Sequence, residues 1–331
     1  MIANRTEKTN EISSIKNILK NIISFNENFE LINQIGSGSE SKVYKISHKK
    51  NKKEFALKHI LNIKSKHHIN ELIISSKLKH KNIINFFGNL SKKEENLEFI
   101  IMESGKYGNL NNFVRTILKR NYLSESMLNF LIYQILQGLY HCHKCKIAHM
   151  DIKPQNIIID EYLNTKIIDF SVSINYMNKK PNDKIKLPFC GTPFYMSSEV
   201  INSKEIKYKD INKIDAYALG ILIYKLAFGY YPFNLKVNDD YKIINQKINN
   251  EYEIKNEIKF SSYFIDFISK LLQRDINKRM SLYEAMEHPW IKASKFIMDE
   301  KENLYNSNLF VLKLISDNIK EFNDYLKNEP K

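Results

Sequence analysis

The chain has 331 residues, with 51 Lys and Arg against 37 Asp and Glu and a formal net charge of +14. Its hydrophobic content of 43% and aromatic content of 12% exclude a disordered chain. The longest apolar run, residues 216–224, is far shorter than the ~20 residues that a membrane-spanning helix requires. The N-terminus has no hydrophobic signal core, so we expect a cytoplasmic protein with no membrane partner.

The positive charge comes almost entirely from lysine, since arginine occurs at only five positions. Lysine appears together with abundant Asn and Ile, a mixture typical of AT-rich genomes such as those of some protists. Recognition of nucleic acids usually uses clustered arginine with interleaved aromatic residues. We therefore expect no specific nucleic-acid partner, and we expect a monomer.

Along the chain, apolar residues at helical spacing first predict an amphipathic helix over residues 10–23. Residues 29–60 then alternate between apolar and polar side chains around two glycines and a lysine-rich turn, which predicts three antiparallel strands. A helix is expected over residues 66–79, and residues 97–104 predict a further strand. This first part of the chain is therefore rich in strands.

From Tyr107 onward the pattern is mostly helical, apart from an irregular stretch that runs to about residue 200. A last segment, residues 306–328, brings six large apolar side chains to one face of a helix. No internal repeat is present. The order of elements predicts an α+β chain with a small strand-rich part followed by a larger helical part.

Several short stretches contain the groups that phosphoryl transfer needs to hold phosphates, neutralise charge and position a hydroxyl. "GSGSES" (36–41) is a glycine-rich turn whose backbone can approach phosphates closely. Lys58 lies between apolar neighbours on a predicted strand and so needs an anionic partner, for which Glu71 on the next helix is the candidate. "HMDIKPQNIII" (149–159) holds an acid, a lysine and an amide in close succession, and "KIIDFSVS" adds Asp169.

These stretches together resemble a eukaryotic protein kinase over about residues 29–291. The signatures of that family occur in the expected order: a glycine-rich loop, a strand lysine, a helix glutamate, a catalytic-loop Asp with its Asn, and a metal-binding Asp-Phe. Further matches are "GTPFYMSSE" (191–199), "KIDAYALGILIYKLAFGYYPF" (213–233) and "LLQRDINKRMSLYEAMEHPWI" (271–291). The resemblance is specific because all of these motifs agree in their order.

The resemblance implies an α+β, bilobal protein-kinase fold. Its small N-lobe, with five antiparallel strands and one helix, would cover residues 29–105, and its larger, mainly helical C-lobe would cover residues 106–292. Helical extensions are expected at residues 1–28 and 293–331. The implied activity is that of a divergent serine/threonine kinase that uses ATP and Mg²⁺, with Mn²⁺ as an alternative ion.

The resemblance also assigns roles residue by residue. Asp151 would orient and deprotonate the substrate hydroxyl, and Lys153 would neutralise the γ-phosphate. Lys58 would bind the α- and β-phosphates and be held by Glu71. The metal ligands would be Asn156 and Asp169. The nucleotide contacts would come from Ile35, Gly36, Gly38, Val43, Ala56, Lys58, Glu71, Met102, Glu103, Gly105, Asn109 and Ile158.

Other positions have supporting roles in this resemblance. Asp215 would brace the catalytic loop, and Glu199 would pair with Arg279. A lysine two residues after the catalytic acid, together with Thr192, is typical of serine/threonine rather than tyrosine kinases.

Some positions depart from the family pattern. Met150 replaces the usual Arg before the catalytic Asp, Ser41 and Ser171 replace glycines, and Ser198 replaces a proline. None of these changes removes a charge that would touch phosphate or magnesium. An active kinase is therefore favoured over the alternative, a pseudokinase that acts as an ATP-binding or scaffold module.

The methionine at position 150 also bears on regulation. In many kinases the arginine at this place gathers the phosphate of a phosphorylated activation loop. The hydroxyl groups inside residues 170–191 belong to Ser171, Ser173 and Tyr176, and the segment before Gly191 has no threonine. We therefore expect activity that does not depend on phosphorylation of this loop.

Substrate preference can be predicted from four positions. Kinases that select basic residues before the target hydroxyl use carboxylates at places that here hold Asn109, Gln155 and Lys225, and often at Phe194. These side chains form no negative pocket, and Lys225 would repel an incoming Arg. We therefore expect protein substrates with neutral or acidic flanks.

Overall fold

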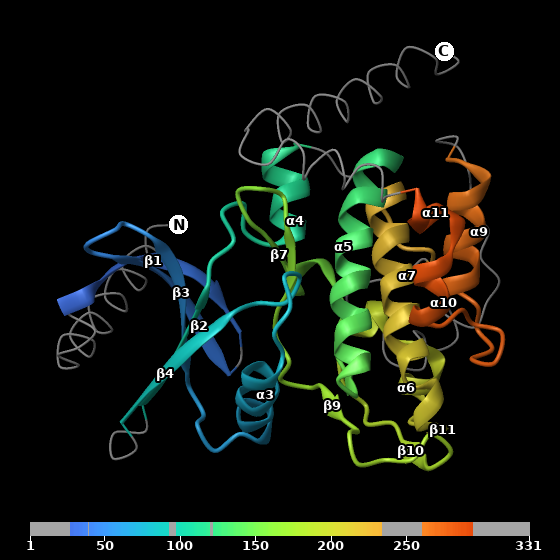
Figure 1. Cartoon of the computed structure of the whole chain (residues 1–331), viewed down its shortest axis with the longest axis horizontal. Coiled ribbons are helices and arrows are strands. Elements are labelled where there is room, and N and C mark those ends of the chain that lie inside the picture. The colour runs from blue at the N-terminus through green and yellow to red at the C-terminus, as the bar shows by residue number, and fades with distance from the viewer. Residues whose placement is uncertain (1–26, 39, 93–96, 120–121, 234–259, 294–331) are drawn as a thin grey trace. The chain divides into compact units, whose positions relative to one another are not determined.

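The computed structural model describes residues 27–38, 40–92, 97–119, 122–233 and 260–293 (Figure 1). The chain divides into two compact units. Of the described residues, the first unit contains those before 78 together with 84–104, and the second contains 78–83 together with those from 105 to 293. The amphipathic helices predicted over 10–23 and 306–328 lie outside the described residues. Within the described ranges, no helix is long and apolar enough to cross a membrane.

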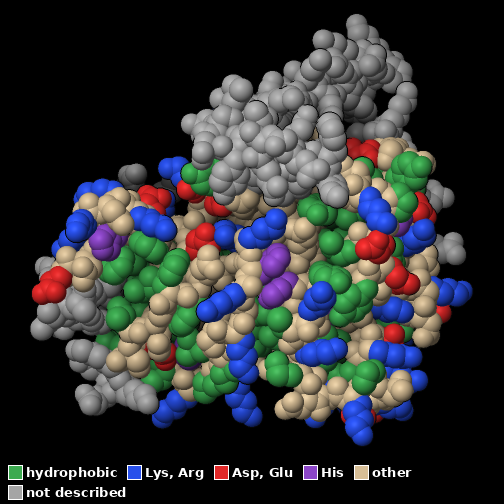
Figure 2. All heavy atoms as spheres, viewed as in Figure 1, with side chains coloured by type: hydrophobic (Ala, Val, Ile, Leu, Met, Phe, Trp, Pro, Cys, Tyr) green, Lys and Arg blue, Asp and Glu red, His purple; other side chains and the backbone are tan. Residues whose placement is uncertain are grey.

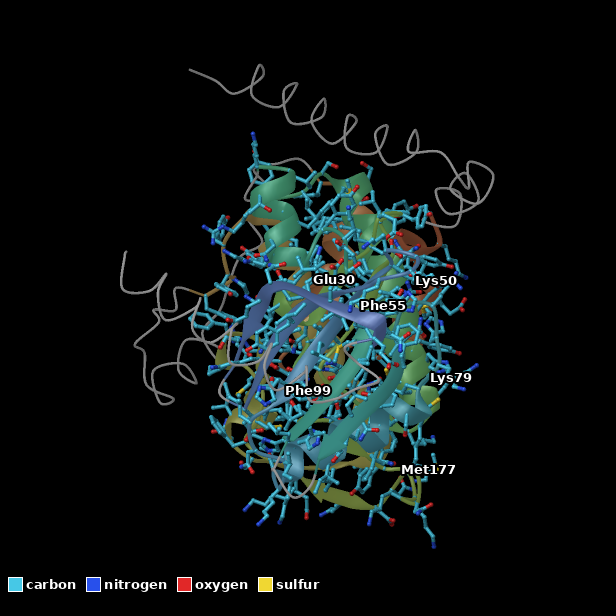
Figure 3. All side chains as sticks on the ribbon, turned by 90° about the vertical axis from the view of Figure 1, so that its left-hand side faces the viewer. Glu30, Lys50, Phe55, Lys79, Phe99 and Met177 are labelled. Atoms are coloured by element: carbon cyan, nitrogen blue, oxygen red, sulfur yellow. The ribbon has the colours of Figure 1, made fainter. Side chains whose placement is uncertain are left out.

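The first unit is built on one antiparallel sheet. Its strands are β1 (Phe29–Ser37), β2 (Ser41–His48), β3 (Glu54–Ile60), β4 (Phe86–Lys92) and β5 (Leu97–Glu103), and they pair in the order β1-β2-β3-β5-β4. Successive side chains of a strand point to opposite faces of the sheet. A core of Tyr44, Ile46, Leu57 and Phe99 therefore gathers on one set of alternate positions, and Figure 3 labels Phe99 among them.

Helix α3 (Lys66–Lys77) also belongs to this unit. Its buried residues are His68, Glu71 and Ile74, which lie three positions apart and so share one face. His68 Nε2 lies 2.9 Å from Glu98 Oε2 on β5. The helix is therefore attached to the sheet by polar groups as well as by an apolar side chain, and it ends two residues before the predicted end.

The second unit is mainly helical. Its helices are α4 (Leu110–Asn112), α5 (Glu125–Lys144), α6 (Ser198–Ile201), α7 (Asn212–Phe228), α9 (Ser262–Leu271), α10 (Leu282–Glu287) and α11 (Pro289–Lys292), with a π-helical turn at Phe113–Ile117. Helix α7 lies beside α5 (Figure 1) and is buried almost all round, as expected of a uniformly apolar helix. A Cβ added at Gly220 would lie 2.8 Å from a methyl carbon of Leu272, so glycine allows α7 to approach the end of α9 closely.

Three small two-stranded sheets lie in and just beyond the stretch that the sequence pattern predicts to be irregular up to about residue 200. They pair β6 (Ile147–Ala148) with β9 (Ile174–Asn175), β7 (Ile157–Ile159) with β8 (Thr165–Ile167), and β10 (Lys184–Lys186) with β11 (Glu205–Lys207). The residues between β6 and β7 are those of the quoted "HMDIKPQN" motif. Short strands on both sides therefore hold the ends of this segment in place.

The two units confirm the predicted protein-kinase fold, with one small five-stranded antiparallel part and one larger helical part. Residues 78–83 fall inside the segment predicted as the N-lobe, but they pack with the second unit. Asn82 explains this placement, because its Nδ2 donates to the carbonyl of Thr165 at 2.9 Å. Its own carbonyl accepts from the amide of Ile167 at 3.0 Å.

Candidate active site

The buried carboxylate of Asp215, on α7, anchors residues 149–156. Asp215 is fully buried and accepts hydrogen bonds from the amides of His149 and Met150, each at 2.8 Å. His143 Nε2 lies 2.7 Å from the same carboxylate. Burial by itself would raise the pKa of Asp215, but the hydrogen bond and charge of His143 outweigh it and lower the pKa below its ordinary value. The predicted bracing by Asp215 is confirmed.

Asp151 lies at the centre of a compact polar network. Its two carboxylate oxygens accept from Lys153 Nζ at 2.7 Å, from the hydroxyl of Thr192 at 2.8 Å and from Asn156 Nδ2 at 3.0 Å. Lys153 Nζ also lies 2.7 Å from the Thr192 hydroxyl. A carboxylate with several hydrogen-bond donors is fixed in orientation. The structure thus brings together the predicted Asp, Lys and Asn.

Gly191 makes the approach of Thr192 possible. Its φ is +98°, which side-chain-bearing residues rarely adopt, and a Cβ there would lie 2.6 Å from the carbonyl of Met150. Any larger residue would therefore push the two chain segments apart. Met150 itself has a φ of +70°, so its backbone is held in a left-handed conformation that is uncommon for non-glycine residues.

A backbone hydrogen bond brings the chain segments of the two predicted metal ligands, Asn156 and Asp169, together. The amide of Ile168 donates to the carbonyl of Asn156 at 2.9 Å, which places the following residue, Asp169, beside the catalytic segment. Asp169 has a φ of +67°. Asn156 donates through Nδ2 to both the backbone carbonyl and the carboxylate of Asp151, so its amide orientation is fixed.

In the first unit, the predicted strand lysine and helix glutamate form a buried ion pair. Lys58 Nζ lies 2.6 Å from both carboxylate oxygens of Glu71, and the two side chains are 12% and 9% exposed. The predicted pairing is confirmed. Lys58 faces Val43 across the β2–β3 register, and Ala56 faces Met102 across the β3–β5 register. These predicted nucleotide contacts therefore lie on neighbouring positions of three adjacent strands.

The glycine-rich turn connects β1 and β2. The amide of Gly38 donates to the carbonyl of Ser41 at 2.8 Å, which closes the turn. Gly36 faces Val43 in the strand register, and a Cβ at Gly36 would lie 3.5 Å from the Val43 side chain, an ordinary contact. Ile35 is largely exposed.

The end of β5 and the residues that follow it contain predicted nucleotide contacts of both units. The amide of Glu103 donates to the carbonyl of Asn85 at 3.0 Å. In the second unit, a Cβ at Gly105 would lie 3.0 Å from Cβ of Ile158, which explains the glycine. Asn109 caps α4, since its side chain accepts from the amide of Asn112 at 2.9 Å.

The predicted site residues thus fall into two sets, each assembled within its own unit. The first unit holds Ile35, Gly36, Gly38, Val43, Ala56, Lys58, Glu71, Met102 and Glu103. The second unit holds Gly105, Asn109, Asp151, Lys153, Asn156, Ile158 and Asp169.

One further predicted pair has a structural place in the second unit. Arg279 is 1% exposed, and its Nη2 lies 3.1 Å from both carboxylate oxygens of Glu199. The guanidinium also lies 4.8 Å from the ring centre of Tyr217. The predicted Glu199–Arg279 pair is confirmed, and it ties α6 to the loop before α10.

Sequence reasoning missed two polar side chains that support the site. His143 is fully buried on α5 and lies 3.0 Å through Nδ1 from the hydroxyl of Tyr176. His68 supports α3 through Glu98. A signal was available for His143, which continues the apolar face of α5 one turn after Leu139. A polar residue on an apolar helix face needs a buried partner.

Comparisons with known proteins agree with this geometry. The protein kinase domain family matches residues 29–291, so the chain belongs to the protein kinase family. It is 31% identical to the serine/threonine-protein kinase pakH of Dictyostelium discoideum over 81% of this chain and 50% of that protein. It is 32% identical to CBL-interacting protein kinase 10 of Oryza sativa over 80% of this chain and 57% of that protein. It is 30% identical to the Aurora kinase of Schizosaccharomyces pombe over 81% of this chain and 72% of that protein. The chain thus spans little more than half the length of the first two relatives.

Proposed function

We propose that this chain is an active serine/threonine protein kinase that transfers the γ-phosphate of Mg-ATP to protein hydroxyl groups. The observation that carries the proposal is the network around Asp151. Its carboxylate is oriented by Lys153, Thr192 and Asn156, and a fixed carboxylate can position a hydroxyl and accept its proton. Phosphoryl transfer asks mainly for such positioning and for charge stabilisation.

The first unit supplies most of the groups that suit the nucleotide. Lys58 would bind the α- and β-phosphates, and Glu71 keeps its amine in place. The glycine-rich turn would approach the phosphates through its backbone. Val43, Ala56 and Ile158 would sandwich the adenine ring, and Met102 would be the gatekeeper residue. Backbone groups of Glu103 and Gly105 would form hydrogen bonds to the ring. Ile35 and Asn109 would complete the nucleotide contacts.

The metal ligands fit Mg²⁺ by their chemistry. Asp169 offers a carboxylate, and Asn156 offers an amide oxygen because its Nδ2 is occupied by Asp151. Mg²⁺ prefers oxygen ligands and usually takes one or two protein groups together with phosphates and water. Within the described residues no group of three His, Cys, Asp or Glu forms an all-protein metal cage. When bound, Mg²⁺ would neutralise charge on the phosphates, and Mn²⁺ has the same ligand preference.

Independence from activation-loop phosphorylation is supported by the packing of Met150. Its side chain lies in an apolar cluster with Tyr176, Leu187, Met196 and Ile206, so apolar contacts hold the loop where other kinases use an Arg–phosphate pair. Treatment with a phosphatase should leave activity nearly intact. A large loss traced to a phosphosite within residues 170–191 would contradict this proposal.

Two of the three hydroxyls in that loop are also unsuited to modification. Ser173 is 6% exposed and donates to the carbonyl of His149 at 3.0 Å. Tyr176 is 6% exposed, and its ring stacks on Tyr208 with 5.9 Å between ring centres. A kinase would have to unfold this part of the loop to reach either group.

The preference for substrates with neutral or acidic flanks is supported by contacts among Phe194, which lies two residues after Thr192, Tyr231 and Lys225. The ring of Phe194 lies 4.8 Å from that of Tyr231, and Lys225 Nζ lies 4.9 Å from the Tyr231 ring centre. Lys225 Nζ also donates to the carbonyl of Gly229 at 2.5 Å, so the amine is fixed. Burial and the charge of Arg115 lower the pKa of Lys225. Two neighbouring cations would repel a basic residue.

A screen of peptide arrays tests this preference. We expect neutral or acidic residues before the phosphorylated position. Strong selection for Arg two or three positions before that residue would contradict the proposal. Lys225→Glu should shift the selection towards basic peptides, whereas Lys292→Glu, an exposed lysine at the end of α11, should leave it unchanged.

The activity itself is tested by transfer of labelled γ-phosphate from Mg-ATP to a generic protein substrate. The wild-type chain should transfer phosphate, and Asp169→Asn should not. If wild type and variant were equally inert while ATP still bound, the chain would instead be a pseudokinase that acts as an ATP-binding or scaffold module. In that case, Met150→Arg and Ser171→Gly, which restore the residues usual in the family, would be the changes to test for recovered activity.

A further inference from the structure

One surface of the second unit concentrates exposed lysines. We define the basic ribbon as residues 179–186 and 204–209, which include the paired strands β10 and β11. It carries two acids, Asp183 and Glu205. Its seven lysines are all exposed: Lys179, Lys180, Lys184, Lys186, Lys204, Lys207 and Lys209. Figure 2 shows Lys and Arg side chains near the lower edge of the molecule, where Figure 1 labels β10 and β11.

The ribbon has one apolar and one charged face. Ile185 and Ile206 face each other across the strand pair and pack against the cluster that contains Met150. Because side chains of a strand alternate between faces, the flanking residues Lys184 and Lys207 lie on the opposite, exposed face. The apolar face therefore fixes the ribbon to the body of the unit, and the lysines project outward.

Most of the positive charges on the exposed face have no ion-pair partner among the described residues. Lys184 lies directly opposite Lys207, and like charges at opposite positions of a strand pair are destabilising. Lys184 pairs with Glu205 at 2.8 Å. No carboxylate among the described residues lies within ion-pair distance of the other six lysines. The side chain of Asp183 instead accepts from the amide of Lys180 at 3.1 Å.

We propose that the basic ribbon is a docking surface for an acidic protein segment, bound in an extended conformation across β10 and β11. Alternate residues of an extended segment lie about 6–7 Å apart on one face, which matches the spacing of Lys184 and Lys186 on their strand. A carboxylate placed beside Lys207 would relieve its repulsion with Lys184. This surface is distinct from the Phe194, Tyr231 and Lys225 side chains that are proposed to select residues next to the target hydroxyl.

The composition of the ribbon favours an acidic protein over other polyanions. It contains no arginine, which nucleic-acid surfaces usually cluster and combine with aromatic side chains. Membrane-surface binding requires apolar side chains that insert beside the cations. Met177 and Phe189 are exposed beside the ribbon, but none of the exposed large apolar side chains belongs to it. The two strands are three residues long, a length that suits a short peptide segment.

Docking here would place an acidic partner on the unit that contains Asp151. Strand β10 belongs to the same chain segment as Leu187 and Cys190, which pack in the cluster around Met150. A substrate protein that carries an acidic segment away from its target hydroxyl would thus gain affinity without any change at the site itself. The inference does not require catalysis, so it stands or falls separately from the proposed function.

The test measures binding of a fluorescein-labelled peptide of alternating Glu and Gly to the full chain, without nucleotide, by fluorescence anisotropy. The triple variant K186E/K204E/K207E should bind about tenfold more weakly than wild type, because each exposed charge pair contributes roughly 0.5 kcal/mol. The matched control K50E/K79E/K278E changes the net charge equally at exposed lysines elsewhere, two of them labelled in Figure 3. It should stay within about twofold of wild type.

Several outcomes would overturn the proposal. Equal weakening in both triple variants would mean a general charge effect, and no weakening in K186E/K204E/K207E would exclude the ribbon. Tighter binding to phosphatidylserine vesicles or to poly(U) RNA, lost in that same variant, would assign the ribbon to another class of partner. If the triple variant does not fold by circular dichroism, Lys207→Ala alone should weaken peptide binding about twofold.

Discussion

The two units hold their charged site residues in different ways. In the first unit, the Lys58–Glu71 pair links one strand to one helix at 2.6 Å. In the second, Asp151 accepts from Lys153, Thr192 and Asn156, which approach it from two segments of chain. Removal of Lys58 takes this buried cation away from Glu71, whereas Asp151 keeps two of its three donors when one of them is removed. We therefore expect the first unit to respond to substitution mainly in stability, and the second mainly in rate.

The largest effect should follow from Asp151→Asn. We expect kcat to fall by about 10³-fold, because the group that accepts the substrate proton is lost while the side-chain shape is kept. Affinity for ATP should be unchanged, as measured by equilibrium binding. Asp183→Asn, which alters an exposed acid of the same unit, serves as the control. A variant as active as wild type would show that Asp151 does not act as the base.

Lys58→Met tests the first unit. It leaves the Glu71 carboxylate buried without its cation, which costs about 3–5 kcal/mol, so the melting temperature should fall by many degrees. The double variant Lys58→Met/Glu71→Leu should recover most of that stability but none of the activity. Differential scanning fluorimetry and phosphate transfer give the two readouts. A double variant no more stable than the single one would mean that burial of an unpaired charge is not the cause.

Met150→Arg compares apolar with charged anchoring of the loop. A guanidinium in the cluster with Tyr176 and Leu187 would be buried without a partner, and we expect a loss of about 2–4 kcal/mol in the free energy of unfolding. Met150→Leu should cost less than about 1.5 kcal/mol. Thermal melts of the two variants measure these two losses in stability. Equal stability of the two would mean that the cluster opens readily to water.

Thr192→Val tests how far the network compensates for one lost donor. Because Lys153 and Asn156 still hold Asp151, we expect kcat to fall only about tenfold, which corresponds to one hydrogen bond to a charged group. Thr192→Ser keeps the hydroxyl and should stay close to wild type. A loss as large as that of Asp151→Asn would show that the donors act as one unit and do not compensate for each other.

The smallest effect concerns pH. Burial, followed by the charges of His141, Lys81 and Lys166, lowers the pKa of His80 to about 4. Its Nδ1 also accepts from the amide of Asn82 at 3.1 Å, which requires the neutral ring. The unfolded chain binds a proton at this histidine below pH 6.5 and the folded chain does not, so stability falls as the pH drops from 6.5 towards 4.

His80→Asn removes this titration and retains an acceptor for the Asn82 amide. We expect the loss of stability between pH 7 and pH 5 to be smaller in the variant by about 1 kcal/mol, a value reduced for the partial exposure of the ring. Urea unfolding at the two pH values measures it. Identical pH dependence in wild type and variant would mean that His80 is protonated in the folded chain.

Parts of the fold and site could be predicted from the sequence because they depend on local pattern. The alternation over residues 29–60 specified three strands, since a strand with one buried face must alternate. The pattern from Tyr107 onward predicted a mainly helical part, and the order of the short motifs identified the family. Lys58 predicted its own ion pair, because an amine between apolar neighbours needs an anion.

Other features could not be read from the sequence because they depend on contacts between distant residues. Residues 78–83 join the second unit through Asn82, whose partners Thr165 and Ile167 lie more than 80 positions away in the chain. The place of His143 on the apolar face of α5 predicts a buried partner, but the partners themselves, Asp215 and Tyr176, are known only once the fold brings them to its two ring nitrogens. Long-range pairs of this kind leave no local periodicity.

The sequence by itself determined the family, the strand-rich and helical parts, and the identity of the charged groups, because each follows from residue type and spacing. The tertiary structure decided what those groups do together. It showed that Met150 lies in an apolar cluster, that Lys225 is fixed over Tyr231, and that β10 pairs with β11 so that Lys184 faces Lys207. Side-chain direction and strand register depend on packing between segments far apart in the chain, and packing is established only when the whole unit folds.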